Sequence, residues 1–296
     1  MRSLIKVQSL TKVYSNGKGI RNVSFDVKEG EVFGFLGPNG AGKTTTLRHL
    51  MGFVNPSSGK ASIHGLDCRR NAAQIQKNLG YLPGEIAFYD NMTGIQFLTF
   101  IDELRGRKDH LRRDQLMARF ELESDRKIRK MSKGMKQKVG LIAAFMHDPA
   151  VLILDEPTSG LDPLMQKRFV ELIIDERNRG KTILMSSHLF NEIDHTCERA
   201  GIIREGEIVT VENIRTLKGA LPQSFIVTLA DGEDMKILRN SGLHYTQRDP
   251  LVVEIMIKED YDPMLRTLSQ CKVVHMVSSP QTLEQIFMGF YGKEHE

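Results

Sequence analysis

The sequence predicts an α/β fold built around a phosphate-binding loop, followed by a small α+β domain. Residues 37–45 follow the GxxxxGK(S/T) pattern and lie between a strand-like and a helix-like apolar run, which is the context that makes this motif credible. A second apolar run, residues 151–154, ends in two carboxylates, where open α/β sheets bind ligands. Short strand and helix patterns alternate from residue 224 onward. We therefore expect one domain over residues 1–215 and another over 220–296.

Composition places the chain among soluble globular proteins. It has 296 residues, of which 40% are hydrophobic and 26% charged, so disorder is not expected. No apolar run approaches the ~18 residues that cross a bilayer, and Arg2, Lys6 and Lys12 interrupt any signal-peptide core. The three cysteines are scattered without a CxxC pattern, which argues against structural zinc or a disulfide framework. We expect a cytoplasmic protein that reaches a membrane only through a partner.

The N-terminal residues predict a hairpin. Residues 3–8 and 23–27 carry strand patterns on either side of the polar turn at 15–19. Tyr14 lies just before this turn. An exposed aromatic ring at that place can stack on a nucleobase, whereas a buried ring would only pack against the turn.

The loop at residues 37–45 is suited to binding an anion. Glycines let consecutive backbone N–H groups curl around a phosphate, and the N-terminus of the following helix adds partial positive charge. Lys43 is expected to reach the terminal phosphates, and the Thr44 hydroxyl to ligate Mg²⁺. The candidate phosphate-binding residues are Gly37, Pro38, Asn39, Gly40, Ala41, Gly42, Lys43, Thr44 and Thr45.

A mostly helical insert is expected over about residues 86–147. Strand patterns at 61–65 and 79–83 precede it, and helix-type spacing of apolar residues runs from 94 to 123. The segment from 102 to 138 carries 13 Lys and Arg against 7 Asp and Glu. Such a segment can meet nucleic acid, phosphate or anionic lipid, or it can be a solvated helix face.

The apolar run at residues 151–154 predicts a central strand buried on both faces. Asp155 and Glu156 follow it directly. Two buried carboxylates would be costly without a cation or shared protons, and this cost favours a functional site. One acid is suited to holding Mg²⁺ and the other to polarising an attacking water. A further apolar run, residues 182–187, predicts a strand that delivers His188 to the same edge.

Together these motifs resemble those of the ATP-binding-cassette (ABC) ATPases, from about residue 5 to residue 211. The family-specific segment is 131–139, Met-Ser-Lys-Gly-Met-Lys-Gln-Lys-Val, which is similar to the LSGGQ signature and its basic continuation. Residues 159–162 resemble the D-loop, His188 the switch histidine, and Tyr14 the aromatic residue that stacks on adenine. The resemblance implies a P-loop ABC ATPase domain with a mixed core sheet, an antiparallel β subdomain and a helical insert.

The resemblance also implies a role for each motif residue around ATP and Mg²⁺. Lys43 and the loop backbone would hold the β- and γ-phosphates, and Thr44 and Asp155 would hold Mg²⁺. Glu156 would polarise the attacking water, a role typically worth ~10²–10⁴-fold in rate. His188 would contact the γ-phosphate and Glu156.

The signature implies a dimer. Ser132 and the Gly134 N–H would complete the ATP site of a second subunit, and Asp162 of the D-loop is a further ATP-binding candidate. The implied active unit is therefore a two-fold dimer, of identical or different chains, that ATP closes and hydrolysis reopens. Lys133 and Met135 stand where glycine and glutamine are usual, yet the residues expected to contact phosphate are kept.

One departure affects the metal site. The family places a glutamine after the strand at 79–83, and this chain has Gly84 followed by Glu85. That glutamine usually contacts Mg²⁺ and the attacking water. We hypothesise that Glu85 takes over part of this role, the alternative being a solvated loop acid.

Residues 224–296 lie beyond the family core. Their patterns predict the order β-α-β-β-α-β, typical of a small ferredoxin-like unit, and then a final amphipathic helix at 282–290. Residues 278–287 resemble the tail of ATPases that serve exporters of drugs, antibiotics, peptides or lipids. This piece holds no catalytic constellation. The alternative interpretation is an appendage for stability or dimerisation, and the two interpretations are compatible with each other.

The leading interpretation is therefore the ATP-hydrolysing subunit of an ABC exporter. It would lie on the cytoplasmic face of the membrane and drive separate polytopic permease subunits, with no nucleic acid partner. One alternative is an importer ATPase with a regulatory C-terminal domain. Another is a soluble ABC ATPase acting on nucleic acid or ribosomes, but the heptad runs or second cassette typical of that class are absent from the sequence.

Overall fold

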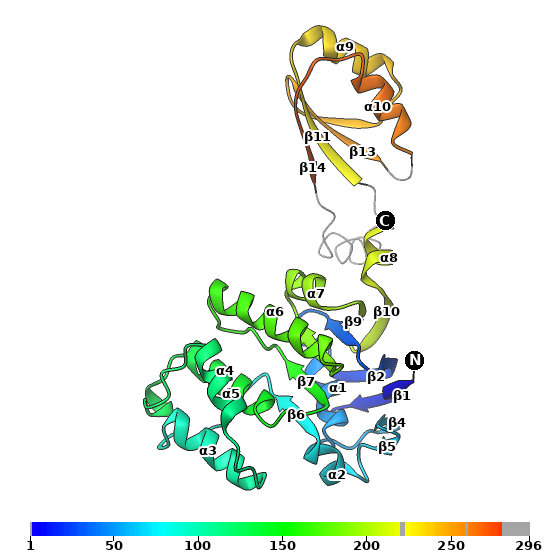
Figure 1. Cartoon of the computed structure of the whole chain (residues 1–296). Helices are drawn as coiled ribbons and strands as arrows, with labels where there is room; N and C mark the ends of the chain where they lie inside the picture. Colours follow the sequence, from blue (N-terminus) through cyan, green and yellow to red (C-terminus); the bar gives the residue numbers. More distant parts are fainter. Residues whose placement is uncertain (1, 220–222, 258–259, 280–296) are drawn as a thin grey trace. The chain divides into compact units, whose positions relative to one another are not determined.

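A computed structural model describes residues 2–219, 223–257 and 260–279 of the chain (Figure 1). The chain divides into two compact units, Met1–Asn213 and Ile214–Glu296. Within the described ranges, every helix is too short or too polar to cross a membrane. The helix predicted at 282–290 lies outside the described residues.

The first unit contains an antiparallel sheet. Its strands are β1 (Ser3–Val13), β2 (Gly19–Lys28), β4 (Ser58–Ile63) and β5 (Leu66–Asp67). They pair in the order β2-β1-β4-β5. The first two strands are longer than their predicted ranges, 3–8 and 23–27. The reason is a bulge at Ser9, which takes a φ of 48° and breaks the apolar alternation while the strand continues.

The second sheet of this unit is mostly parallel. Its strands are β3 (Val32–Leu36), β6 (Leu79–Leu82), β7 (Val151–Asp155), β8 (Thr182–Ser187), β9 (Arg199–Arg204) and β10 (Glu207–Asn213). Their order is β10-β9-β3-β8-β7-β6, with only β10 antiparallel to its neighbour. Every residue of β3, β7 and β8 is buried, as continuous apolar runs predict for central parallel strands.

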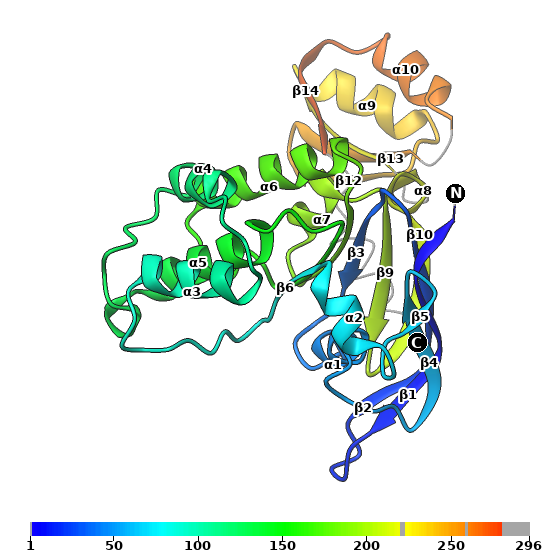
Figure 2. The same cartoon turned by 60° about the horizontal axis from the view of Figure 1, so that its bottom comes forward.

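Helices cover both faces of the second sheet (Figure 2). Helix α1 (Lys43–Leu50) packs between the two sheets, and its Leu47 shares a core cluster with Phe33 and Phe35 of β3. Gly34 faces the other side because side chains alternate along a strand. A Cβ there would lie 2.6 Å from Ile193 of α7 (Phe190–Thr196), and α6 (Pro163–Asn178) packs against α7. The sheet is therefore closed off from water on both sides.

The helical insert lies at the opposite end of the unit from the antiparallel sheet (Figures 1 and 2). It contains α3 (Gly94–Leu104), α4 (Leu111–Arg119), a 3₁₀ turn (Ile128–Lys130) and α5 (Lys133–Phe145). Both α3 and α4 pack on α5, and α5 packs on β6. The short helix α2 (Ala72–Lys77) precedes β6 and lies outside the insert.

The second unit begins with α8 (Ile214–Gly219). Its other elements in the described residues are β11 (Gln223–Leu229), α9 (Gly232–Asn240), β12 (Tyr245–Asp249), β13 (Val252–Ile257), α10 (Asp262–Leu268) and β14 (Val273–Ser279). The six follow the order β-α-β-β-α-β, and the strands pair antiparallel as β12-β13-β11-β14. Val227 and Val253 of the sheet share a buried cluster with Met235 and Met264 of the two helices, so one sheet face forms the core of this unit.

Candidate active site

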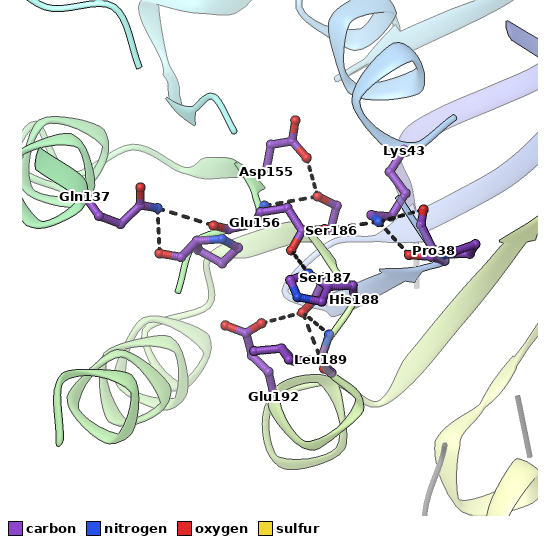
Figure 3. Close-up of polar contacts among 12 residues, drawn as sticks. Pro38, Lys43, Gln137, Asp155, Glu156, Ser186, Ser187, His188, Leu189 and Glu192 are labelled. Carbon is purple, nitrogen blue, oxygen red and sulfur yellow. Dashed lines mark hydrogen bonds and ion pairs between the residues drawn. The ribbon is translucent and has the colours of Figure 1, made fainter. Parts of the chain in front are cut away.

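Three adjacent strands end at the candidate site. The order β3-β8-β7 places the loop at 37–45, His188 and the pair Asp155–Glu156 side by side (Figure 3). Leu36 is in register with Ser187, and Asp155 is in register with Ser186. Parallel pairing therefore brings together at one edge the residues that the sequence analysis assigned to phosphate, metal and water.

Glycines are required in the phosphate-binding loop. Gly40 and Gly42 take φ values of 84° and 110°, which L side chains rarely adopt. A Cβ on Gly37 would lie 2.4 Å from the carbonyl oxygen of Ile203, so the loop also passes too close to β9 for a larger residue. Helix α1 starts at Lys43 with no acidic residue in its first turn. Its N-terminal N–H groups therefore remain suited to an anion.

Lys43 lies inside the curl of its own loop. The residue is only 5% exposed, and its Nζ donates to the carbonyl oxygens of Gly37 at 2.5 Å and Pro38 at 3.3 Å. The same ammonium lies 3.1 Å from Oε1 of Glu156 (Figure 3). The lysine is thus held at the centre of the site, and a carboxylate from the neighbouring loop balances its charge.

Glu156 has an unusual backbone conformation. It takes a φ of 50°, which is uncommon for a residue other than glycine and is often found at functional sites. Its N–H donates to the Ser186 carbonyl oxygen and to the Ser186 Oγ, both at 3.2 Å. Its Oε2 lies 2.6 Å from Nδ1 of His188. The side chain is 19% exposed, so the prediction of two buried carboxylates is wrong for Glu156, whose charge is compensated by the ion pair with Lys43.

Asp155 fits a divalent cation. It is fully buried, and its Oδ1 accepts a 2.5 Å hydrogen bond from Ser186 Oγ. Among the described residues, no hydrogen-bond partner faces Oδ2. A buried carboxylate oxygen without a partner is costly, and oxygen is the ligand that Mg²⁺ prefers. Burial, and after it the charge of Asp155, raises the pKa of Tyr81 to about 12, so this charge acts across the site.

Gly84 borders the same oxygen. A Cβ at position 84 would lie 3.2 Å from Oδ2 of Asp155. Thr44, Gly84 and Glu85 line a common cavity of about 520 Å³. Glu85 is exposed there, and its part in metal binding stays a hypothesis.

The signature segment and the loop at 159–162 lie against each other. Ser132 is the N-cap of α5 and accepts a 3.2 Å hydrogen bond from Met135 N–H. A Cβ on Gly134 would lie 2.5 Å from the carbonyl oxygen of Gly160, so only glycine allows this contact. Asp162 caps α6 by accepting from the N–H of Met165 at 3.0 Å. Across the described ranges, no hydrogen bond or ion pair joins the signature segment to the phosphate-binding loop.

Tyr14 lies at the turn of the β1–β2 hairpin. Its backbone closes the turn through hydrogen bonds with Lys18 and Gly17, at 2.8 and 2.9 Å. The side chain is 38% exposed, and Lys12 Nζ lies 5.7 Å from the ring centre. The ring is therefore accessible, as base stacking requires.

Two residues of the site escaped the sequence analysis. Ser186 binds both Asp155 and Glu156, and its signal is a hydroxyl near the end of an apolar strand. Gln137 is buried on α5, and its Nε2 donates to the carbonyl oxygens of Glu156 at 3.3 Å and Pro157 at 2.8 Å. The signal of Gln137 is a polar residue on the apolar face of a helix, inside the signature segment itself.

Comparisons with protein families, relatives and solved structures all match this chain to ABC transporter proteins. The family described as "ABC transporter" matches residues 20–159. The bacitracin transport ATP-binding protein BcrA of Bacillus licheniformis is 38% identical over 212 residues, covering 71% of this chain and 69% of BcrA. An uncharacterized ABC transporter ATP-binding protein of Nostoc is 32% identical, covering 99% of this chain and 91% of the relative. A solved structure of an ABC transporter ATP-binding subunit matches with a TM-score of 0.67 at 28% identity, covering 73% and 92%.

Proposed function

Because this chain belongs to the family of ABC transporter ATP-binding proteins, we propose that it is the ATP-hydrolysing subunit of an ABC exporter. The observation that carries this proposal is the convergence of Lys43, Glu156 and His188 within bonding distance at the ends of three parallel strands. The name of BcrA, a bacitracin transport ATP-binding protein, supports transport of a peptide-like or drug-like compound out of the cell.

ATP would bind through the phosphate-binding loop. The β- and γ-phosphates of ATP would accept hydrogen bonds from the backbone N–H groups of residues 37–45. Lys43 Nζ would leave Glu156 and bind a phosphate oxygen. The accessible ring of Tyr14 would stack on adenine. Stacking and phosphate contacts act on opposite ends of the nucleotide, so together they set its orientation.

Thr44 and Asp155 would hold Mg²⁺. The ion, when bound, neutralises negative charge on the phosphate oxygens. Ser186 keeps one oxygen of Asp155 engaged at 2.5 Å, which leaves Oδ2 for the cation. The Thr44 hydroxyl lies on the first turn of α1, next to the lysine that contacts the phosphates.

Glu156 would polarise the attacking water. Once Lys43 turns to a phosphate, Oε1 of Glu156 can accept a proton from water while Oε2 stays against His188. Nδ1 of His188 would stay against Glu156, and Nε2 would contact the γ-phosphate. His188 would thereby fix the carboxylate relative to the phosphorus it serves.

The active unit would be a two-fold dimer. Ser132 and Gly134 make no hydrogen bond or ion pair with the phosphate-binding loop among the described residues, which supports their use on the ATP of a second subunit. That subunit would be a copy of this chain or a related one. Separate membrane-spanning subunits would respond to closure of the dimer and carry the substrate.

Purification from membranes tests this proposal. The tagged chain, extracted in mild detergent, should carry with it a polytopic membrane protein, and the complex should hydrolyse MgATP. A chain that is recovered without any membrane protein, and that shifts on RNA or DNA at physiological salt, would contradict the transporter assignment.

A further inference from the structure

Glu192 is a buried carboxylate just outside the residues assigned above. It lies in the first turn of α7, four positions after His188, and is 7% exposed. Its Oε2 accepts a 2.6 Å hydrogen bond from Ser187 Oγ (Figure 3). The Thr158 hydroxyl lies close to the same carboxyl group, but Oε1 has no hydrogen-bond partner among the described residues. The Ser187 hydroxyl is therefore the group bonded to this acid.

The bond to Ser187 orients the segment that carries His188. Ser187 Oγ has a single proton, which it donates to Glu192, so its lone pairs are left for the Leu189 N–H at 2.9 Å. These two bonds fix the chain on both sides of His188. The imidazole then lies 2.6 Å from Glu156. Removing the acceptor at Glu192 would free the hydroxyl to rotate and loosen this turn.

Glu192 also lies close to Thr158, on the other side of the site. Thr158 follows the Glu156–Pro157 pair and leads directly into the loop at 159–162. Gly160 of that loop is the residue against which Gly134 of the signature segment packs. Glu192 thus lies between the turn that carries His188 and the loop that touches the signature.

We propose that Glu192 is a positioning residue for ATP hydrolysis, which holds His188 on Glu156 through the hydroxyl of Ser187. The inference rests on the proposed ATPase function. It assigns Glu192 no contact with ATP, water or metal.

The surroundings of Glu192 support a functional rather than a packing role. Burial raises the pKa of this carboxyl to about 7, against the opposing effect of the hydrogen bond from Ser187 and of the nearby Thr158 hydroxyl. Of the neighbouring charges, Glu156 at the end of β7 raises the pKa and His188 after β8 lowers it. A strongly perturbed acid next to catalytic groups is typical of functional sites.

The test compares Glu192→Gln with the wild type in MgATP hydrolysis. We expect kcat to fall about 10-fold and KM for ATP to change less than about 2-fold, since no ground-state contact with ATP is removed. Wild-type kcat should rise as the pH passes about 7, and this rise should be absent from the variant. Ser187→Ala should lower kcat similarly, and the double variant should lose no more than the larger single loss.

Control variants separate this inference from the proposed function. Glu171→Gln, at an exposed position of α6, should leave all parameters unchanged, and Glu192→Asp should recover part of the rate. A wild-type protein without ATPase activity would contradict the proposed function. The outcome that would overturn only the role of Glu192 has two parts. The wild type is active and loses its activity in Glu156→Gln, while Glu192→Gln keeps the wild-type kcat and pH profile.

Discussion

Lys43 Nζ lies 3.1 Å from Oε1 of Glu156, while the other oxygen of this carboxylate lies 2.6 Å from His188. The group assigned to phosphate and the group assigned to water are therefore bonded to each other. A γ-phosphate that attracts Lys43 would release Oε1 of Glu156 in the same event. Under the proposed roles, binding of ATP and exposure of the base would be coupled through this ion pair.

The first prediction concerns this carboxylate. Glu156→Gln keeps the size of the side chain but removes its charge, so the variant should bind ATP and hydrolyse it about 10²–10⁴-fold more slowly. The nucleotide-loaded dimer should accumulate and be visible by size-exclusion chromatography with retained ATP. Glu171→Gln serves as the matched control. Hydrolysis by Glu156→Gln near the native rate would remove Glu156 from its role.

A second prediction concerns the missing glutamine. If Glu85 supplies an oxygen for Mg²⁺ or its water, Glu85→Ala should raise the Mg²⁺ concentration that gives half-maximal ATPase activity. Gly84→Gln should offset that loss, because a side chain at position 84 starts 3.2 Å from Oδ2 of Asp155. The measurement is a Mg²⁺ titration of the single and double variants. An unchanged Mg²⁺ requirement in Glu85→Ala would show that this acid is only a solvated loop residue.

The fold and the site residues that follow the central strands could be predicted because their sequence signals are local. The predicted ABC ATPase fold is confirmed. It could be predicted because the loop at 37–45, the acids at 155–156 and His188 each follow an apolar run that forms a buried strand. Parallel strands bring such endings together without further information. The structure brings these predicted residues together at one edge of the sheet, and their roles toward ATP stay predictions.

The remaining contacts could not be predicted because they depend on register and packing. Ser186 meets Asp155 only because β7 and β8 pair in one particular register. Gln137 donates to the Glu156 carbonyl, and these two residues lie 19 positions apart in the chain. The positive φ of Glu156 has no signature in residue type, since glutamate rarely takes this conformation.

A third prediction uses the pH dependence of stability. Burial raises the pKa of Glu192 to about 7 from the ordinary value of 4.5, so the folded state binds a proton more tightly than the unfolded state. The resulting stabilisation is complete below about pH 4.5 and is lost as the pH rises through about 7. Its full size is about 3 kcal/mol, at 1.36 kcal/mol per pKa unit.

Glu192→Gln should abolish this dependence. The difference in unfolding free energy, variant minus wild type, should therefore increase from pH 5 to pH 8. This holds whether the variant is more or less stable than the wild type at a given pH. Chemical denaturation at both pH values measures the difference. If the gap between the two proteins is the same at pH 5 and pH 8, Glu192 does not titrate in this window.

A fourth prediction concerns the shared ATP sites of the proposed dimer. Lys43→Ala should destroy the phosphate side of the site, and Ser132→Arg should block the signature side, so each variant alone should be inactive. In a mixed dimer, the intact Lys43 of one chain would face the intact Ser132 of the other at one site, while the second site would carry both defects. Two-fold symmetry allows no other arrangement.

Co-expression with two different tags, followed by sequential affinity purification, would isolate the mixed dimer, whose ATPase rate should be about half that of the wild-type dimer. A mixed dimer as inactive as its parents would mean that two copies of this chain do not form shared sites. The chain's partner would then be a different ATP-binding subunit, or each site would be completed within one chain.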